Sequence, residues 1–363
     1  MKNFKVLLRV MALCLLVCMT FVSCDSGDTV QTEPPLAETS GDITDEPTDS
    51  SDAEEKTVIN AMSYNVWGGG DKTTTANDGT PLPRMTVLVR GAKINAMLNG
   101  EDIDVAGFQE VSNRTDWANA SYNWIGTRLD EKYGYIVGQT QDIGSGAYII
   151  YKKDRFEVLD SGVFCLTDGA PASKTGVPQK LRDSDFERIC NWAVFKVKET
   201  GEIFLFMDTH LAAGLCKTAA SDATPSKVRA AQTKILVSQI PVLRNKVKTG
   251  YGVSDCPVIL VGDMNSNSAS NEYSIITKTL QDSLKVSKGK SVDEKYDTYT
   301  GLWHCKGTWD YKAKGDARID FVFVSKEGLS VLNYKMIHTS TNLCPYGEYM
   351  SDHNAVIARL ELS

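Results

Sequence analysis

The sequence is poor in histidine and in paired cysteines, the residues that build most zinc and redox sites. It has only 4 histidines among 363 residues. Six cysteines lie beyond residue 57, namely Cys165, Cys190, Cys216, Cys256, Cys305 and Cys344. No two of them form a Cys-x-x-Cys pair, which argues against a zinc or thioredoxin-type site. In an exported protein some can form disulfides, and we consider Cys305 with Cys344 as one pairing.

Most of the chain also lacks net charge. The formal charge of −7 arises near the N-terminus, where residues 1–24 contribute +3 and residues 25–56 contribute −10. Residues 57–363 are therefore neutral. A neutral domain gives no support for a broad basic surface that would hold nucleic acid, although it leaves room for a small basic patch.

No apolar run is long enough to span a membrane. The run from Val10 to Val22 follows three basic residues and has the length of a secretory signal. It ends in Phe21-Val22-Ser23-Cys24, which resembles a bacterial lipobox. We therefore expect residues 1–24 to be a lipoprotein signal with Cys24 as the lipidated residue; the alternative is an ordinary cleaved signal. Both place the protein outside the cytoplasm, as a membrane-anchored lipoprotein or in secreted form.

Residues 25–56 contain eleven acidic residues and one basic residue, with very few apolar side chains. Such a segment cannot bury enough surface to offset its ordering entropy, so we expect a disordered acidic tether. Residues 57–363 are long enough for one large α/β domain, and no break in composition divides them.

Periodicity predicts alternating strands and helices in this domain. Expected helices cover Met85–Leu98 and Pro225 to about Gln239. Expected strands cover Val58–Trp67, 103–111, 146–153, 188–197, 202–211, 256–266, 317–325 and the final stretch after His353. In the last strand Val356, Ala358 and Leu360 alternate with Ala355 and Ile357. The pattern favours a sheet-rich sandwich with helices outside over a doubly wound parallel sheet.

Several apolar strands end in polar residues that bind hard cations and phosphates. They are Asn65, Gln109, Glu110, Asp208, His210, Asp263, Asn265, Arg318, Asp320, Asp352 and His353. Each alone is most simply a turn-former, a helix cap or a hydrogen-bonded core residue. Together their oxygen atoms suit Mg²⁺, Mn²⁺ or Ca²⁺. Asp320 lies in an otherwise apolar strand, where a histidine partner would offset the cost of burying an acid.

The segments SYNVWGG, AGFQEV, GAYIIYKK, DTHL, VGDMNSN, RIDFVFVS and SDHNAV, in this order, resemble the motifs of the endonuclease/exonuclease/phosphatase superfamily. The resemblance covers nearly all of residues 57–363. It implies a DNase I-like four-layered α/β sandwich, in which two mainly antiparallel β-sheets pack together with helices outside.

The resemblance also implies a metal site. Glu110 would be the principal ligand, with Asn65 close to it and Asp352 in or near the metal shell. Mg²⁺ is the expected ion, with Mn²⁺ or Ca²⁺ as alternatives. Some exonuclease III-like enzymes have an acid where this chain has Trp67, so we expect no second metal ligand there.

The remaining roles are likewise implied by the resemblance. Asp263 and Asn265 would position the attacking water and the phosphate. Asp320 would hydrogen-bond His353, fix its tautomer and stabilise its cation.

His210 would contact the phosphate or the leaving group, and Arg188 would bind phosphate. The sequence leaves open which of the two histidines assists the water. Two interpretations of Trp117, Tyr122 and Trp124 stay open: they face the substrate, or they pack on the surface of a helix.

We therefore expect a metal-dependent phosphodiesterase or phosphomonoesterase that cleaves phosphate esters by in-line attack of water. Its substrate would be a small molecule or a lipid headgroup. Two alternatives stay open: a secreted endonuclease or exonuclease of the same fold, and a non-catalytic binding lipoprotein. Competent residues at every catalytic position argue against the last of these.

Overall fold

The computed structural model describes residues 56–68, 75, 79–82, 86–111, 129–138, 146–166, 188–213, 225–302 and 317–363. The expected leader with Cys24, nearly all of the tether, the aromatic segment around Trp117, and Cys216 and Cys305 lie outside the described residues. Within the described ranges, no helix combines the length and the apolar character needed to cross a membrane.

The described strands form two six-stranded sheets. The first has the order β11-β12-β1-β2-β4-β3 and the second the order β5-β6-β7-β8-β10-β9. Their bounds are β1 Val58–Asn65, β2 Val105–Val111, β3 Tyr133–Ile136, β4 Gly146–Lys152, β5 Phe156–Cys165, β6 Ile189–Val197, β7 Ile203–His210, β8 Val258–Asp263, β9 Leu280–Asp282, β10 Asp320–Ser325, β11 Leu329–Ile337 and β12 Ala355–Leu362. The described helices are α1 Val87–Gly100, α4 Pro225–Tyr251, α5 Asn271–Thr279 and α6 Ser283–Val286.

Both sheets have the same pairing pattern. One parallel pair, β1 with β2 or β7 with β8, lies at the centre, and every other neighbour is antiparallel. The predicted sandwich of mainly antiparallel sheets is therefore confirmed.

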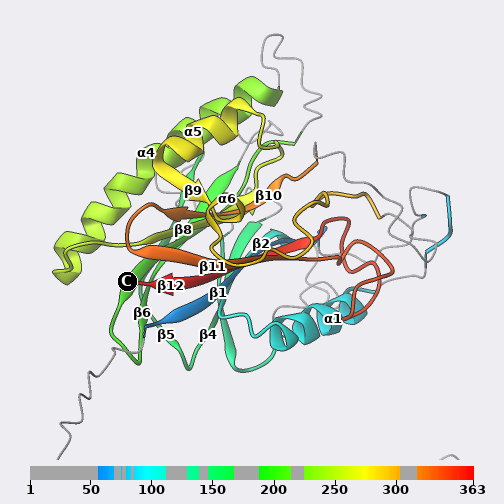
Figure 1. The fold of residues 1–363 in the computed structure, drawn as a ribbon, viewed down its shortest axis with the longest axis horizontal. Coiled ribbons are helices and arrows are strands. Elements are labelled where there is room, and N and C mark those ends of the chain that lie inside the picture. Colours follow the sequence, from blue (N-terminus) through cyan, green and yellow to red (C-terminus); the bar gives the residue numbers. More distant parts are fainter. Residues whose placement is uncertain are drawn as a thin grey trace, which may run out of the picture. The chain divides into compact units, whose positions relative to one another are not determined.

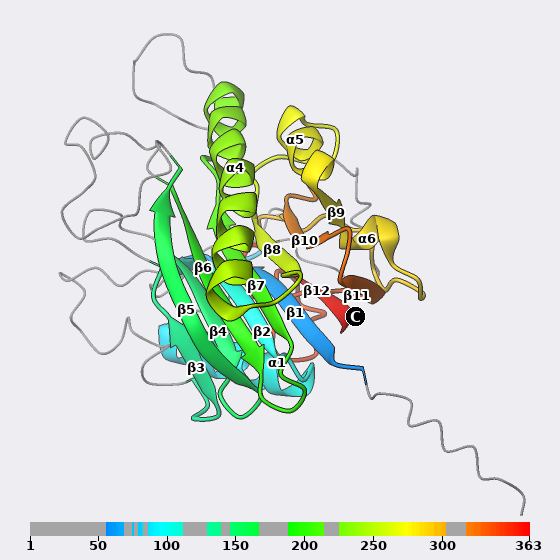
Figure 2. The ribbon, with the colours of Figure 1, turned by 90° about the vertical axis from the view of Figure 1, so that its left-hand side faces the viewer.

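The elements form four layers, with helices on the outer faces of both sheets (Figures 1 and 2). Helix α1 packs Ile94 and Met97 against the outer face of the first sheet. Helix α4 packs Leu236 and Ile240 against the outer face of the second sheet. A third apolar cluster fills the space between the sheets and includes Phe195, which packs against Phe204. Burial of the apolar side chains in these three clusters provides the main driving force for folding.

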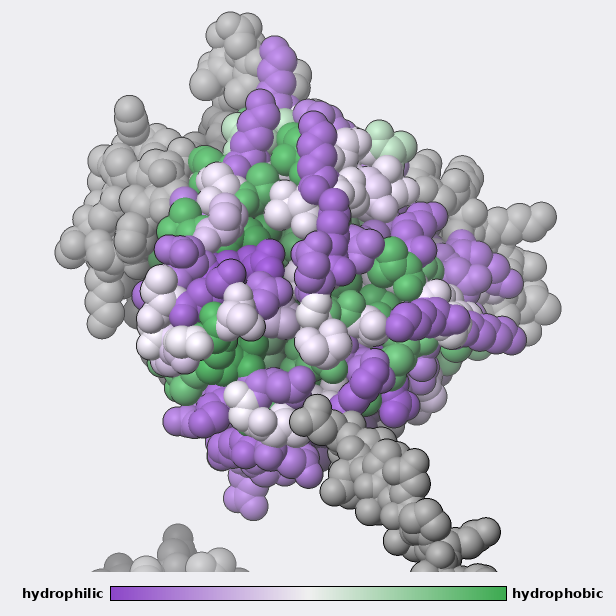
Figure 3. All heavy atoms as spheres, turned by 60° about the vertical axis from the view of Figure 1, so that its left-hand side comes forward, coloured by the Kyte–Doolittle hydropathy of each residue, from purple (hydrophilic) through white to green (hydrophobic). Residues whose placement is uncertain are grey.

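The alternation of the last strand is confirmed. Val356, Ala358 and Leu360 lie in the core between the sheets, whereas Ala355 and Ile357 face the layer that contains α1. Exposed apolar residues are spread over the surface, with Val89, Tyr135 and Val242 on three separate elements. Figure 3 shows one face of the molecule, on which apolar residues are interspersed among polar ones. Scattered exposure of this kind is normal for a folded protein.

Two sequence predictions are wrong in detail. Helix α4 does not end near Gln239 but continues through Pro241 to Tyr251. A proline removes only one hydrogen-bond donor, and Leu243 and Val247 beyond it remain buried. Cys344 is a buried free thiol next to the Met350 sulfur, so the pairing with Cys305 is also wrong.

Strands β3, β5, β9 and β11 and helices α5 and α6 were not predicted. Strand β5 has a burial pattern that mixes buried, half-buried and exposed positions without strict alternation, and such a strand carries little periodic signal. Helix α5 begins at the N-cap Ser270, whose side chain accepts a hydrogen bond from the amide of Tyr273. A serine cap alone does not distinguish a helix from a turn.

We expect Gly107 to control the separation of the two sheets. A Cβ atom at this position would lie 2.3 Å from Val261 Cγ2 and 2.6 Å from Asp208 Cγ, both across the sandwich. Gly107→Ala should therefore lower the free energy of unfolding by about 1–3 kcal/mol through overpacking. Urea unfolding measures this change. The matched control is Gly250→Ala in α4, where nothing lies within 4 Å; equal stability of both variants would contradict the expectation.

Candidate active site

The strand polarity brings the predicted residues to one edge of the sandwich. Because β1 and β2 are parallel, Asn65 pairs with Gln109 and lies beside the end of β2. In the second sheet, His210 pairs with Asp263, and Asp263 pairs with Asp320 at the start of antiparallel β10. Ends of parallel strands and starts of antiparallel ones thus meet at the same edge.

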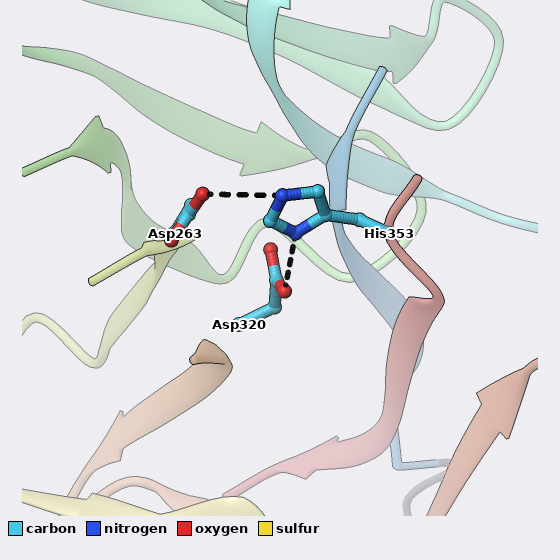
Figure 4. Close-up of side chains that lie close together, drawn as sticks. All are labelled: Asp263, Asp320 and His353. Carbon is cyan, nitrogen blue, oxygen red and sulfur yellow. Dashed lines mark hydrogen bonds and ion pairs between the residues drawn. The ribbon is translucent and has the colours of Figure 1, made fainter. Parts of the chain in front are cut away.

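A buried hydrogen bond joins the two sheets at this edge. Asp320 Oδ2 lies 2.9 Å from His353 Nδ1 (Figure 4). Asp320 is fully buried and His353 is 5% exposed. The backbone amide of Asp320 donates to Thr298 Oγ1, and Thr339 Oγ1 donates to the carbonyl of His353. The predicted hydrogen bond is therefore present, and its two partners are held by further bonds.

His353 is cationic at neutral pH. Its second ring nitrogen, Nε2, lies 3.7 Å from Asp263 Oδ2. Burial alone would lower the pKa of His353, but the charges of Asp320 and Asp263 outweigh burial and raise this pKa to about 10. Burial and the nearby charge of Asp320 raise the pKa of Asp263 to about 7. Asp263 is therefore suited to exchange a proton near neutrality.

His210 has the opposite protonation state. Burial, together with the charges of Arg188 and His353, lowers its pKa well below the usual range. His210 Nδ1 lies 3.4 Å from Arg188 Nη1, and Nε2 lies 2.8 Å from Asn265 Nδ2. The site thus combines one cationic and one neutral imidazole, and such a division is typical of acid–base chemistry.

The carboxylate of Asp263 contacts several of the other site residues. Its Oδ2 accepts a hydrogen bond of 3.0 Å from Asn65 Nδ2, and its Oδ1 accepts one of 2.8 Å from the amide of Asn265. His210 Nε2 lies 3.4 Å from the same Oδ2. The side chain of Asp263 is almost fully buried. These contacts fix the orientation of a carboxylate that links residues from both sheets.

The predicted metal ligands lie next to Asp263. Asn65 Nδ2 is 3.3 Å from Glu110 Oε1, and Ser351 Oγ connects the carbonyl of Asn65 to Asp352 Oδ1. Glu110 and Asp352 are only half-buried. Burial, and then the charges of Asp352, Glu110 and Asp263, raise the pKa of Tyr299. Carboxylate and amide oxygens of this kind fit a hard divalent cation.

Backbone strain is concentrated in the same region. Glu110 has φ of 60° and Asn265 has φ of 47°, values that residues other than glycine rarely adopt. The ladder between β2 and β4 is irregular between Phe108 and Val111, on either side of Glu110. Such conformations persist only where the surrounding structure enforces them, and they cluster at functional sites.

Asp263, Asp320 and His353 also lie close enough together to surround one ion. However, each ring nitrogen of His353 already faces a carboxylate, and the cationic ring would repel a metal ion. The geometry therefore indicates a hydrogen-bonded relay for these three residues. Glu110 and Asp352 remain the better candidates for metal ligands.

The residues to which the resemblance gives a role thus lie at one edge, and Arg188 reaches the site through His210. Arg318 instead bonds to Asp282 of β9. The implied roles remain predictions. The sequence reasoning missed Tyr299, whose ring centroid lies 5.0 Å from that of His353, and the supporting hydroxyls of Thr298 and Ser351. Ser351 lies inside the SDHNAV segment and could have been found there. No periodic signal marked Tyr299.

Comparison with known proteins agrees with this architecture. A sequence model described as the endonuclease/exonuclease/phosphatase family matches residues 239–353, which include Asp263, Asp320 and His353. Solved structures of the same family have the same fold over most of the chain. Over residues 239–353 the chain is thus similar to the endonuclease/exonuclease/phosphatase family. Its members hydrolyse phosphoester bonds. A search of curated proteins found no match.

Three solved structures illustrate the range of this fold. A family protein from Bacteroides thetaiotaomicron is 22% identical, with a TM-score of 0.59 over 85% of this chain and 96% of that one. A mannosyl-6-phosphatase from the same organism is 23% identical, with a TM-score of 0.57 over 83% and 99%. TDP2 from D. rerio, complexed with single-strand DNA product, is 18% identical, with a TM-score of 0.52 over 84% and 99%. These likenesses show the fold alone.

A buried polar group lies beneath the site. Gln109 Nε2 donates to Asp208 Oδ1 at 2.6 Å, and this bond connects β2 to β7. Asp208 Oδ2, Gln109 Oε1 and Asn191 Oδ1 have no hydrogen-bond partner among the described residues. Burial raises the pKa of the Asp208 carboxyl well above its usual range. The neutral carboxyl is therefore the form that the fold accommodates.

We expect Asp208→Asn to be at least as stable as the parent protein at pH 8, by up to about 1–3 kcal/mol, because an amide avoids the cost of a buried charge. With a raised folded pKa, the carboxyl stabilises the fold below its unfolded pKa, and this contribution is lost as the pH rises. The difference between the two proteins should therefore vanish near pH 4. Urea titrations at both pH values measure it, with Glu131→Gln at an exposed turn as control. Destabilisation of Asp208→Asn at pH 8 would contradict this account.

Proposed function

We propose that this chain is a divalent-metal-dependent hydrolase of phosphate esters that acts by in-line attack of water. The observation that carries the proposal is the juxtaposition of two groups at one edge. One is the relay of Asp320, His353 and Asp263, and the other is the oxygen-rich pair of Glu110 and Asp352. A binding protein would need neither a cationic and a neutral histidine side by side nor an acid with a pKa near neutrality.

Glu110, Asn65 and Asp352 would hold the ion, for which Mg²⁺ is the first candidate and Mn²⁺ or Ca²⁺ are alternatives. When bound, such an ion would supply a Lewis acid that neutralises charge on the phosphate and the leaving oxygen. This assignment follows from the donor atoms and their partial exposure. The half-buried carboxylates of Glu110 and Asp352 can reach a ligand, whereas Asp320 is fully buried in the core.

The remaining steps belong to the side chains of the protein. Asp263 Oδ2 would take the proton of the attacking water, because its pKa of about 7 matches neutral conditions. The cationic ring of His353, held by Asp320, would stabilise the negative charge that develops on the phosphoryl group. The bond between phosphorus and the leaving oxygen then breaks, the leaving oxygen takes a proton from solvent, and an alcohol and a phosphate are released. Asp263 returns its proton to solvent.

His210 and its neighbours would bind the phosphoryl oxygens from the other side. Asn265 Nδ2 and the Arg188 guanidinium both lie against the His210 ring. Amide and guanidinium donors are suited to phosphate oxygens. His210 would be neutral when the substrate binds, so its ring offers one donor and one acceptor.

We favour a small phosphoester over nucleic acid as substrate. Residues 57–363 are formally neutral, whereas nucleic-acid enzymes rely on Lys and Arg that neutralise backbone phosphates. The similar mannosyl-6-phosphatase supports a small sugar phosphate, while the similar TDP2 with bound DNA product supports the nuclease alternative. We also propose export as a lipoprotein anchored through Cys24, on the basis of the leader and the lipobox-like segment.

We expect Asp320→Asn to lower kcat by about 10²–10⁴-fold, because the relay loses the charge that maintains the His353 cation. Glu110→Gln should lower activity and shift the Mg²⁺ dependence to higher concentration. Steady-state kinetics with a phosphomonoester and a phosphodiester, over a Mg²⁺ series, measure both effects. Glu157→Gln, at an exposed position of β5, is the matched control.

No hydrolysis of either ester or of plasmid DNA, with Mg²⁺ or Mn²⁺ present, would refute the proposal and leave the binding lipoprotein. Degradation of plasmid DNA in preference to the small esters would favour the nuclease instead. In that case the loss of activity in Glu110→Gln would show that the same site is responsible.

A further inference from the structure

We propose that Tyr299 is the stacking platform for the leaving group, and that this group carries a saturated sugar-like ring. The inference rests on the proposed hydrolase function and narrows its substrate class. It starts from an aromatic side chain that remains 43% exposed although it lies beside the most buried residues of the site.

The backbone holds Tyr299 rigidly at this place. Its amide donates to the carbonyl of Ala317 at 3.0 Å, and Tyr299 forms an isolated antiparallel bridge with His353. The amide of Thr300 donates to the carbonyl of Asp352 at 3.1 Å. The side-chain hydroxyl of the preceding residue, Thr298, accepts a hydrogen bond from the backbone amide of Asp320. Tyr299 is thus fixed to the segments that carry both partners of the relay, and a platform fixed in this way loses little entropy on binding.

The ring of Tyr299 stands directly beside the reacting groups. Its centroid lies 5.0 Å from that of the His353 imidazole, at an interplanar angle of 56°. The backbone of the neighbouring Thr300 is bonded to Asp352, one of the proposed metal ligands. A phosphate held between the relay and the carboxylates would therefore place one of its ester groups next to this ring.

A small apolar cluster lies close in sequence to the site residues. Leu302 and Tyr349 are buried together, with Trp67 and Leu82 packed against them. Three of these four residues, Trp67, Leu302 and Tyr349, have positive φ angles of 58°, 68° and 51°. Along the sequence, Trp67 lies two residues after Asn65, Leu302 lies three residues after Tyr299, and Tyr349 lies three residues before Asp352. Such backbone conformations cluster at functional sites, so this packing supports the segments that carry Tyr299 and Asp352.

The exposed Tyr299 ring beside a polar site favours a sugar ring. The apolar face of a saturated ring can pack on the exposed tyrosine, as amphipathic groups pack on aromatic surfaces. Its hydroxyl groups can donate to the surrounding carboxylates, which accept hydrogen bonds only. A nucleobase would also stack on Tyr299, so it forms a separate arm of the test.

The test compares the parent protein with Tyr299→Ala and Tyr299→Phe on four substrates: glucose 6-phosphate, mannose 6-phosphate, a nucleoside 5′-monophosphate and the ringless glycerol 3-phosphate. The parent protein should prefer at least one hexose phosphate over glycerol 3-phosphate by about tenfold or more in kcat/KM. Tyr299→Ala should lose this preference mainly through KM, while Tyr299→Phe should keep it. Tyr135→Ala, at an exposed tyrosine of β3, is the matched control and should change nothing.

Equal kcat/KM ratios in the parent protein and Tyr299→Ala would overturn the platform while leaving the hydrolase function intact. A preference for the nucleotide that is lost in Tyr299→Ala would overturn the sugar assignment. A second readout does not need turnover. In the Asp320→Asn background with Mg²⁺, calorimetry should show at least tenfold weaker binding of the preferred hexose phosphate when Tyr299 is alanine. Unchanged affinity would overturn the proposal even if no ester is hydrolysed.

Discussion

The hydrogen bond between Asp320 and His353 is the interaction on which the rest of the site depends. It joins β10 of one sheet to the residue that precedes β12 of the other. Neither group could remain in this core alone, because an unpaired buried charge costs far more than a paired one. The bond therefore fixes the relative position of the two sheet edges, and it also sets the charge that the site presents to a substrate.

The site follows from the polarity of the strands. Each sheet has one central parallel pair, and the ends of these pairs provide Asn65, Glu110, His210 and Asp263. Antiparallel neighbours bring Asp320 to the same edge. The two histidines then differ because of their surroundings. Carboxylates flank His353 and raise its pKa, whereas burial, and then the charges of Arg188 and His353, lower the pKa of His210. One fold thus supplies a cation and a neutral ring within one site.

Much of this arrangement could be predicted from the sequence. An acid in an apolar strand, Asp320, needs a partner, and His353 at the entrance of the last strand is the partner that the structure shows. The apolar alternation of β12 also predicted which side chains face the other sheet. These predictions succeeded because the cost of burial and the period of a strand are local properties of the sequence.

Other features depend on contacts that no local pattern encodes. Helix α4 continues through Pro241 because residues beyond it are buried against the second sheet. Tyr299 lies beside His353 only because its backbone pairs with two distant segments. The bond between Gln109 and Asp208 requires the close approach of the sheets at Gly107. Each of these features follows from tertiary packing, so the sequence alone could not reveal it.

The most direct test of this account is an NMR titration of the His353 imidazole in the metal-free protein, compared with Asp320→Asn. In the parent protein the ring should stay cationic through neutral pH and lose its proton only near pH 10, because the carboxylates raise its pKa to about 10. In Asp320→Asn the pKa should fall by several units. Titration of His353 near its ordinary pKa of about 6.5 in both proteins would contradict the central role of the buried pair.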